Sequence, residues 1–151
     1  MAQILTRDFG VMEYAAGEQF EFPTGLPGFP RETFFLPIEV PEQFPLLYLQ
    51  SVRNSQLCFV ALPVKCIVPD FKLCANAEDL AAIGLAPDAQ PGPGMLCLAL
   101  ICFTRDGMAT ANLRAPIIVN VKTRMGVQSI QSDDRYPFRF PVHGEKEATV
   151  C

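Results

Sequence analysis

The sequence predicts an all-β domain, mainly antiparallel, folded as a small β-barrel-like or two-sheet structure with one short helix near residues 77–83. Most of the chain consists of short apolar runs separated by turn residues, which is typical of strands. Asp106-Gly107 lies between two such runs, and this dipeptide favours hairpins because both residues tolerate positive φ. An antiparallel sheet of many short strands must hide its edges, and a barrel or two packed sheets does so.

The expected strands follow one another along the chain. In the first half they cover residues 2–6, 9–14, 33–39, 46–52 and 57–64. In the second half they cover residues 95–104, 108–113, 115–123 and 127–132. Short turns at 105–107 and 124–126 separate members of the second group, so the last four strands are expected to form a meander.

One helix is predicted after Asn76, which can cap its first turn. Glu78 and Asp79 follow where the positive end of the helix dipole favours acids. Leu80 and Ile83 lie on one side, and Gly84 is suited to end the helix.

Length and composition restrict the class of protein. The 151 residues suit one domain, expected to span 1–141, followed by a polar, flexible tail at 142–151. The apolar run 95–103 is too short to span a membrane and the N-terminus lacks the pattern of a signal peptide, so a cytosolic protein is expected. Residues 1–95 carry eleven acids against five bases, which argues against non-specific nucleic-acid binding.

Six cysteines and a single histidine, His143, offer little for a metal or cofactor site, because no CxxC pair occurs. Five of the cysteines lie in or beside apolar runs and are expected to be buried, reduced thiols. Cys151 is expected to be the accessible one. Common catalytic motifs are absent, and a cysteine nucleophile would need a basic partner in space. A small cysteine-dependent enzyme with an unknown substrate stays open as the alternative function.

The segment FPTGLPGFP, residues 22–30, is unusual because prolines and glycines alternate with large apolar residues. Prolines restrict φ and glycines allow tight reversals, so the segment predicts a stiff loop that holds Phe22, Leu26 and Phe29 in place. A phosphate loop is disfavoured because Pro27 lacks a backbone N–H. Two interpretations stay open: the apolar residues plug one end of a barrel, or some of them face a partner. The candidate residues are Gly25, Leu26, Pro27, Gly28 and Phe29.

The segment ANLRAPIIVN, residues 111–120, places two amides in otherwise apolar strand sequence. Buried Asn112 and Asn120 would each need hydrogen-bond partners, and Pro116 indicates an edge strand or a bulge. The amides either stabilise a break in the strand or contact a partner. The candidate residues are Asn112, Leu113, Arg114 and Pro116.

The chain resembles the FliW family of flagellar assembly factors from about Ile4 to Pro141. The resemblance is carried by the combination of GLPGF and NLRAPIIVN, together with FGVMEY, LLYLQSV and LCFVALP. The resemblance implies a cytoplasmic, non-enzymatic, β-barrel-like protein without cofactors, expected to be a monomer. It implies two protein partners, flagellin and the translational regulator CsrA, whose repression of flagellin mRNA the factor relieves. By motif position, partner contacts are expected at residues 25–29 and 112–116. The cysteine content, the loop 86–94 and the tail depart from the family pattern.

Overall fold

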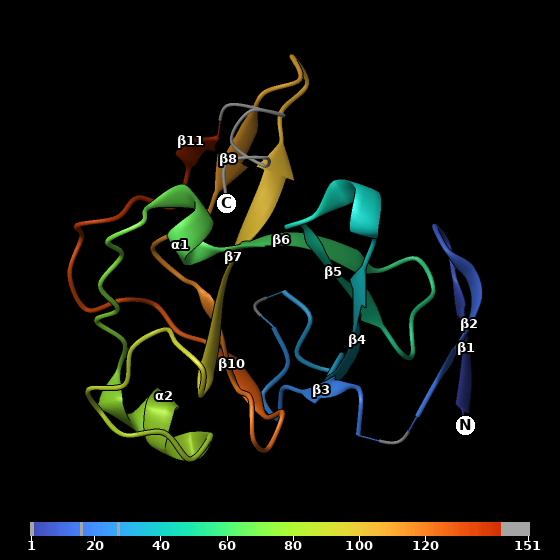
Figure 1. Ribbon diagram of the computed structural model, residues 1–151, viewed down its shortest axis with the longest axis horizontal. Helices are drawn as coiled ribbons and strands as arrows, with labels where there is room; N and C mark the ends of the chain where they lie inside the picture. Colours follow the sequence, from blue (N-terminus) through green and yellow to red (C-terminus); the bar gives the residue numbers. More distant parts are fainter. Residues whose placement is uncertain (1, 16, 27, 143–151) are drawn as a thin grey trace.

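The computed structural model describes residues 2–15, 17–26 and 28–142, and these form an almost entirely β structure (Figure 1). The strands are β1 (Ala2–Thr6), β2 (Gly10–Tyr14), β3 (Phe20–Glu21), β4 (Phe34–Glu39), β5 (Leu47–Ser51), β6 (Cys58–Pro63), β7 (Met95–Phe103), β8 (Ala109–Ala111), β9 (Ile117–Asn120), β10 (Gly126–Gln128) and β11 (Phe140–Val142). The helical segments are η1 (Pro41–Gln43), α1 (Val64–Ile67) and α2 (Ala77–Ala82). Each of the nine expected runs overlaps a strand.

The main sheet is antiparallel and closes into a barrel. Its strand order is β10-β9-β7-β6-β5-β4-β3. The two ends of this order meet at a parallel bridge between Glu21 and Met125, where the amide of Glu21 donates to the carbonyl oxygen of Arg124 (3.0 Å). The predicted barrel-like, mainly antiparallel fold is therefore confirmed. Two strands were not predicted: β3 has only two residues, and β11 contains Pro141 in a stretch without strand periodicity.

The expected meander of the last four strands is wrong in one respect. Strands β8 and β9 do not pair with each other but lie end to end against β7, in the registers Ile101↔Ala111 and Leu98↔Ile117. The residues 112–116 between them form a break in one interrupted strand, as Pro116 indicated. The final turn also begins earlier than expected, since β9 ends at Asn120 and Gly126 already belongs to β10.

The predicted helix is α2, and its capping follows the prediction. The side chain of Asn76 accepts a hydrogen bond from the amide of Glu78 (2.7 Å), and Gly84 adopts a φ of 79° after the last turn. The single-turn helix α1 was not predicted, because Val64–Ile67 continues the apolar pattern of β6. Within the described residues, no helix has the length and apolar character needed to cross a membrane.

Three apolar clusters fill the structure. The barrel core consists of Phe20, Phe22, Leu26, Phe35, Leu47, Leu49, Ala61, Leu98, Ile117 and Val119. A second cluster, which we call the helix-side core, lies on the opposite faces of β7 and β9 and includes Phe71, Leu80 and Tyr136. The third joins Ile4 and Tyr14 of the β1–β2 hairpin to Leu36 and Ile38 of β4. Figure 1 shows the hairpin and the two helices on opposite sides of the molecule.

The boundary expected between domain and tail falls inside a strand. Val142, the first residue of the predicted tail, belongs to β11 and pairs with Ala109 of β8. The remainder of that prediction, together with His143 and Cys151, lies outside the described residues.

Candidate functional site

The loop 22–30 leaves β3 and folds back onto itself through short backbone hydrogen bonds. The amide of Phe22 donates to Thr33, and that of Gly25 donates to Phe22 (both 2.7 Å). Leu26 and Phe29 then form a bridge in which each amide donates to the other residue's carbonyl oxygen (3.3 and 2.7 Å). Pro27, between them, lies outside the described residues. The loop is therefore a tight, internally bonded structure, as the sequence predicted.

Gly25 is required in this loop for two reasons. Its φ is 68°, a backbone angle that residues with a side chain rarely adopt. A Cβ atom there would lie 2.5 Å from the carbonyl oxygen of Phe29. Gly28 has a φ of 89° but open space around it. The two glycines thus allow the reversal that brings Phe29 back beside Leu26.

The three apolar side chains of the loop divide between core and surface. Phe22 and Leu26 are buried in the barrel core, and the ring of Phe22 lies 5.7 Å from that of Phe35. Phe29 is 39% exposed and packs edge-to-face on Phe59, with ring centroids 5.7 Å apart. The loop therefore plugs the barrel with Phe22 and Leu26, whereas Phe29 presents part of its ring to solvent.

The segment 112–116 is held by side-chain amides. Asn112 accepts a hydrogen bond from the amide of Ala115 (3.0 Å), which stabilises the break between β8 and β9. Gln131 donates to the carbonyl oxygen of Leu113 (2.7 Å), and Gln128 donates to that of Ala115 (3.0 Å). Asn112 thus has the structural role considered for it, the stabilisation of a break in the strand. Asn120 also has such a role, since it donates to the carbonyl oxygen of Ile83 (2.8 Å).

Only part of this segment is accessible to a partner. Leu113 and Pro116 are buried, whereas Asn112 and Arg114 are half-buried. The guanidinium of Arg114 lies 5.6 Å from the ring centre of Phe138, a cation–π contact, and Phe138 itself is exposed. Phe138 was missed by sequence reasoning because it lies in a polar, proline-containing stretch without strand periodicity.

The two predicted segments are separate in the structure. Among the described residues, no hydrogen bond or ring contact joins the loop 22–30 to residues 112–116. Gly25 and Leu26 are buried in the one segment, as are Leu113 and Pro116 in the other. The accessible members are Gly28, Phe29, Asn112 and Arg114.

Two cysteines of the barrel sheet carry thiols that burial keeps protonated. Burial raises the pKa of Cys97 to about 12 and, together with the nearby charge of Asp8, that of Cys58 to about 11. Of the five cysteines expected to be buried, only Cys97 is; Cys58 and Cys66 are half-buried, and Cys74 and Cys102 are exposed. Cys102 lies where β7 runs into its hairpin with β8, and Cys74 points away from the core that its neighbour Leu73 enters. Within the described ranges, no three His, Cys, Asp or Glu side chains gather as metal ligands would.

These burial differences predict the order of thiol labelling. At pH 8, a thiol-specific reagent should modify Cys74 and Cys102 in the native protein, whereas Cys97 should react only after unfolding. With pKa values of about 11 and 12, only about a thousandth or less of Cys58 and Cys97 is thiolate at that pH, and raising the pH should increase the reaction of Cys58 first. Mass spectrometry of digested samples identifies each site. Rapid modification of native Cys97 would contradict the prediction.

Comparison with known proteins places these motifs in one family. The model of the FliW protein family matches residues 3–142. The flagellar assembly factor FliW of Shouchella clausii is 32% identical over 143 residues, covering 93% of this chain and 94% of the relative. That of Syntrophomonas wolfei is 29% identical over 147 residues, covering 97% and 92%.

A solved structure shares the fold. The crystal structure of the flagellar assembly factor FliW superimposes with a TM-score of 0.81 at 27% sequence identity, covering 96% of this chain and 99% of the other. The loop 22–30 and the segment 112–116 both lie within the part of the chain that the family model matches.

Proposed function

Because the chain belongs to the FliW family of flagellar assembly factors, we propose that it binds flagellin and CsrA and thereby couples translation of flagellin mRNA to assembly. Free flagellin occupies the factor, so CsrA stays active as a repressor. When flagellin is exported, the factor is released and antagonises CsrA. The observation that carries the proposal is a single family match over residues 3–142, which includes both motifs that the sequence singled out.

The partner contact that we propose centres on the loop 22–30. Phe29 supports it because an aromatic side chain held on a rigid loop binds without a large loss of conformational freedom. Gly28 beside it is exposed, so a partner can approach the backbone closely there. Asn112 and Arg114 are proposed as a second contact region, with Phe138 beside Arg114.

We propose that the protein acts in the cytoplasm as a non-enzymatic monomer, without cofactors and without direct binding to nucleic acid. The cytoplasm is proposed because flagellin before export and CsrA on mRNA are both located there. A cysteine-dependent enzyme gains no support from Cys58 and Cys97, because burial keeps both thiols protonated.

The experiment that tests the proposal uses purified flagellin and purified CsrA. Each is titrated separately into the full chain in a calorimeter, and a third titration adds flagellin to the preformed CsrA complex. We expect saturable binding of both, with flagellin lowering the apparent affinity for CsrA. Absence of binding to both proteins would overturn the proposal, and binding of flagellin without any effect on CsrA would overturn the coupling.

The charge distribution predicts a salt dependence of the association with CsrA. Residues 1–95 carry eleven acids and five bases, and a protein that binds RNA must present basic surface to phosphate groups. Charges steer association and are screened over about 8 Å at physiological salt. In stopped-flow measurements, the association rate constant should fall several-fold between low and high salt, while the dissociation rate constant changes less.

A control for this charge argument is RNA itself, which should not bind the chain in a gel-shift assay at physiological salt. A salt-independent association rate, or tight binding of RNA, would contradict the argument. Arg114, Lys122 and Arg124 would then be the first residues to replace.

A further inference from the structure

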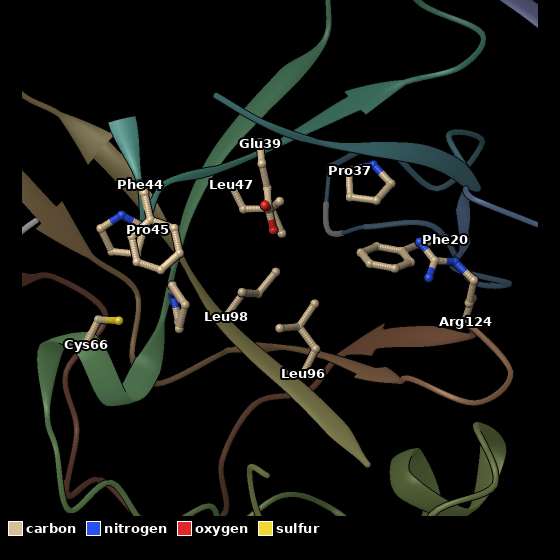
Figure 2. A pocket seen from close by; sticks show the side chains of 11 residues that line it. Phe20, Pro37, Glu39, Phe44, Pro45, Leu47, Cys66, Leu96, Leu98 and Arg124 are labelled. Atoms are coloured by element: carbon tan, nitrogen blue, oxygen red, sulfur yellow. The ribbon is translucent and has the colours of Figure 1, made fainter. Parts of the chain in front are cut away.

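A cavity of about 390 Å³ opens into the barrel (Figure 2). Its wall is mainly apolar and includes Phe20, Leu47 and Leu96. Phe44 belongs to the same wall and exposes two-thirds of its surface. Cavities of this size that are apolar and carry a few polar groups are the usual form of a ligand site.

Two charged side chains face this cavity from different walls. Figure 2 shows Glu39 on one side and Arg124 beside Phe20 on another. Arg124 lies at the end of the turn before β10, with a φ of 63°, and its guanidinium carbon lies 4.7 Å from the ring centre of Phe20. Phe20 and the backbone therefore fix the position of this positive charge at the edge of an apolar wall.

The guanidinium of Arg124 is incompletely bonded. Its Nη2 donates to the carbonyl oxygen of Glu18, but its Nε is buried and has no hydrogen-bond partner among the described residues. A buried N–H without a partner costs free energy that a bound acceptor would recover. Within residues 2–15, 17–26 and 28–142, no carboxylate forms an ion pair with Arg124.

A second, polar hollow of about 290 Å³ shares Arg124 with the cavity. Gln19, Glu21 and Lys122 line it. The Oε1 atom of Gln19 is buried there and, like the Nε of Arg124, lacks a partner among the described residues. The two hollows together thus offer an apolar wall, the cations Arg124 and Lys122, the carboxylates Glu39 and Glu21, and an unpaired donor and acceptor close to one another.

We propose that this composite site, the cavity plus the polar hollow, binds a peptide segment of a partner protein that carries a bulky apolar side chain beside a carboxylate. The apolar side chain enters the cavity between Phe44 and Leu96. The carboxylate lies against Arg124 and Lys122, and a peptide N–H donates to Oε1 of Gln19. A purely apolar ligand would leave both buried polar atoms unpaired, and a cationic group, which has no acceptor, would leave the Nε of Arg124 unpaired.

The composite site shares no residue with the segments 25–29 and 112–116, so this inference does not rest on the proposed partners. If the composite site binds no peptide, the proposed binding of flagellin and CsrA is unaffected. If flagellin and CsrA do not bind, the proposal for the composite site is likewise unaffected.

The test uses two probe peptides, acetyl-Phe-Asp-amide and acetyl-Phe-Asn-amide, titrated into the ¹⁵N-labelled full chain and followed by NMR. We expect saturable shifts of the amides of Gln19, Leu96 and Arg124, and an affinity about fivefold higher for the aspartyl peptide, as a partly exposed charge pair gives. Absence of saturable shifts at these amides would overturn the proposal. Equal affinities of the two peptides would overturn it as well.

Two variants and one control separate the contribution of the apolar wall from that of the charge. Leu96→Trp should fill the cavity and abolish binding of both peptides. Arg124→Asn keeps a residue that tolerates positive φ and should remove the preference for the aspartyl peptide, whereas Arg53→Asn removes one exposed arginine elsewhere and should leave that preference intact. If Arg124→Asn does not fold, Lys122→Gln tests the charge in its place, with a smaller loss of preference expected. Unchanged binding by Leu96→Trp would contradict the proposed position of the apolar side chain.

Discussion

Replacing Phe22 with alanine should lower the free energy of unfolding by about 3–5 kcal/mol, the usual cost of truncating a buried aromatic side chain. Phe22 is fully buried in the barrel core and packs against Phe35. Its ring also fills the space beside Gly126, where an added Cβ would lie 2.5 Å from Cε1 of Phe22. The wall around Phe22 consists of backbone as well as side chains, so the cavity left by the substitution should collapse only partly. Equilibrium unfolding in urea, monitored by circular dichroism, measures the loss.

The matched control for this variant is Phe103→Ala. Phe103 is 65% exposed, so the same change of residue type should cost less than about 1 kcal/mol. Similar losses for the two variants would show that the loop 22–30 does not plug the barrel. The slope of the unfolding free energy against urea concentration (the m value) should stay unchanged in both variants, since neither replacement alters the surface exposed on unfolding by much.

Replacing Phe29 with alanine should instead weaken partner binding by about 2 kcal/mol or more, as truncation of an aromatic hot spot does. That loss corresponds to about a 30-fold increase in the dissociation constant. Phe29 is partly exposed and contacts Phe59, so its truncation should destabilise the protein less than that of Phe22. Calorimetric titration with flagellin and with CsrA shows which partner uses this ring.

Stability and binding must be measured on the same Phe29→Ala protein. A large loss of stability with unchanged affinity for both partners would assign Phe29 to the core. Loss of neither quantity would exclude both roles. Phe138→Ala is the companion variant for the second proposed region, because Phe138 is exposed and contacts Arg114 without entering the core.

Local signals were sufficient to predict most of the fold. The cap at Asn76 and the acids after it led to α2, and the alternation of apolar residues led to nine of the strands. Short-range chemistry acts in both cases, so neighbouring residues carry the information. By contrast, β3 has two residues and gains its place only by pairing with β4, which no local pattern reveals.

The candidate site was less predictable than the fold. The sequence indicated a stiff loop, but the division between buried Leu26 and half-exposed Phe29 depends on what lies opposite each side chain. The same holds for Arg124, whose sequence neighbours suggest only a turn. Its contact with Phe20 joins residues about 100 positions apart, and a single sequence does not reveal such distances.

The closure of the barrel between Glu21 and Met125 also determines when, during synthesis, the fold can be completed. The strands β4 to β7 form antiparallel pairs between neighbours in the chain, so their pairing can begin as each one leaves the ribosome. The first strand of the barrel, β3, must wait for a segment about 100 residues downstream before its free edge is covered. Until then the nascent chain is an open sheet with its apolar inner face accessible to water. The nascent chain should therefore be most vulnerable to aggregation before residues 124–125 emerge from the ribosome.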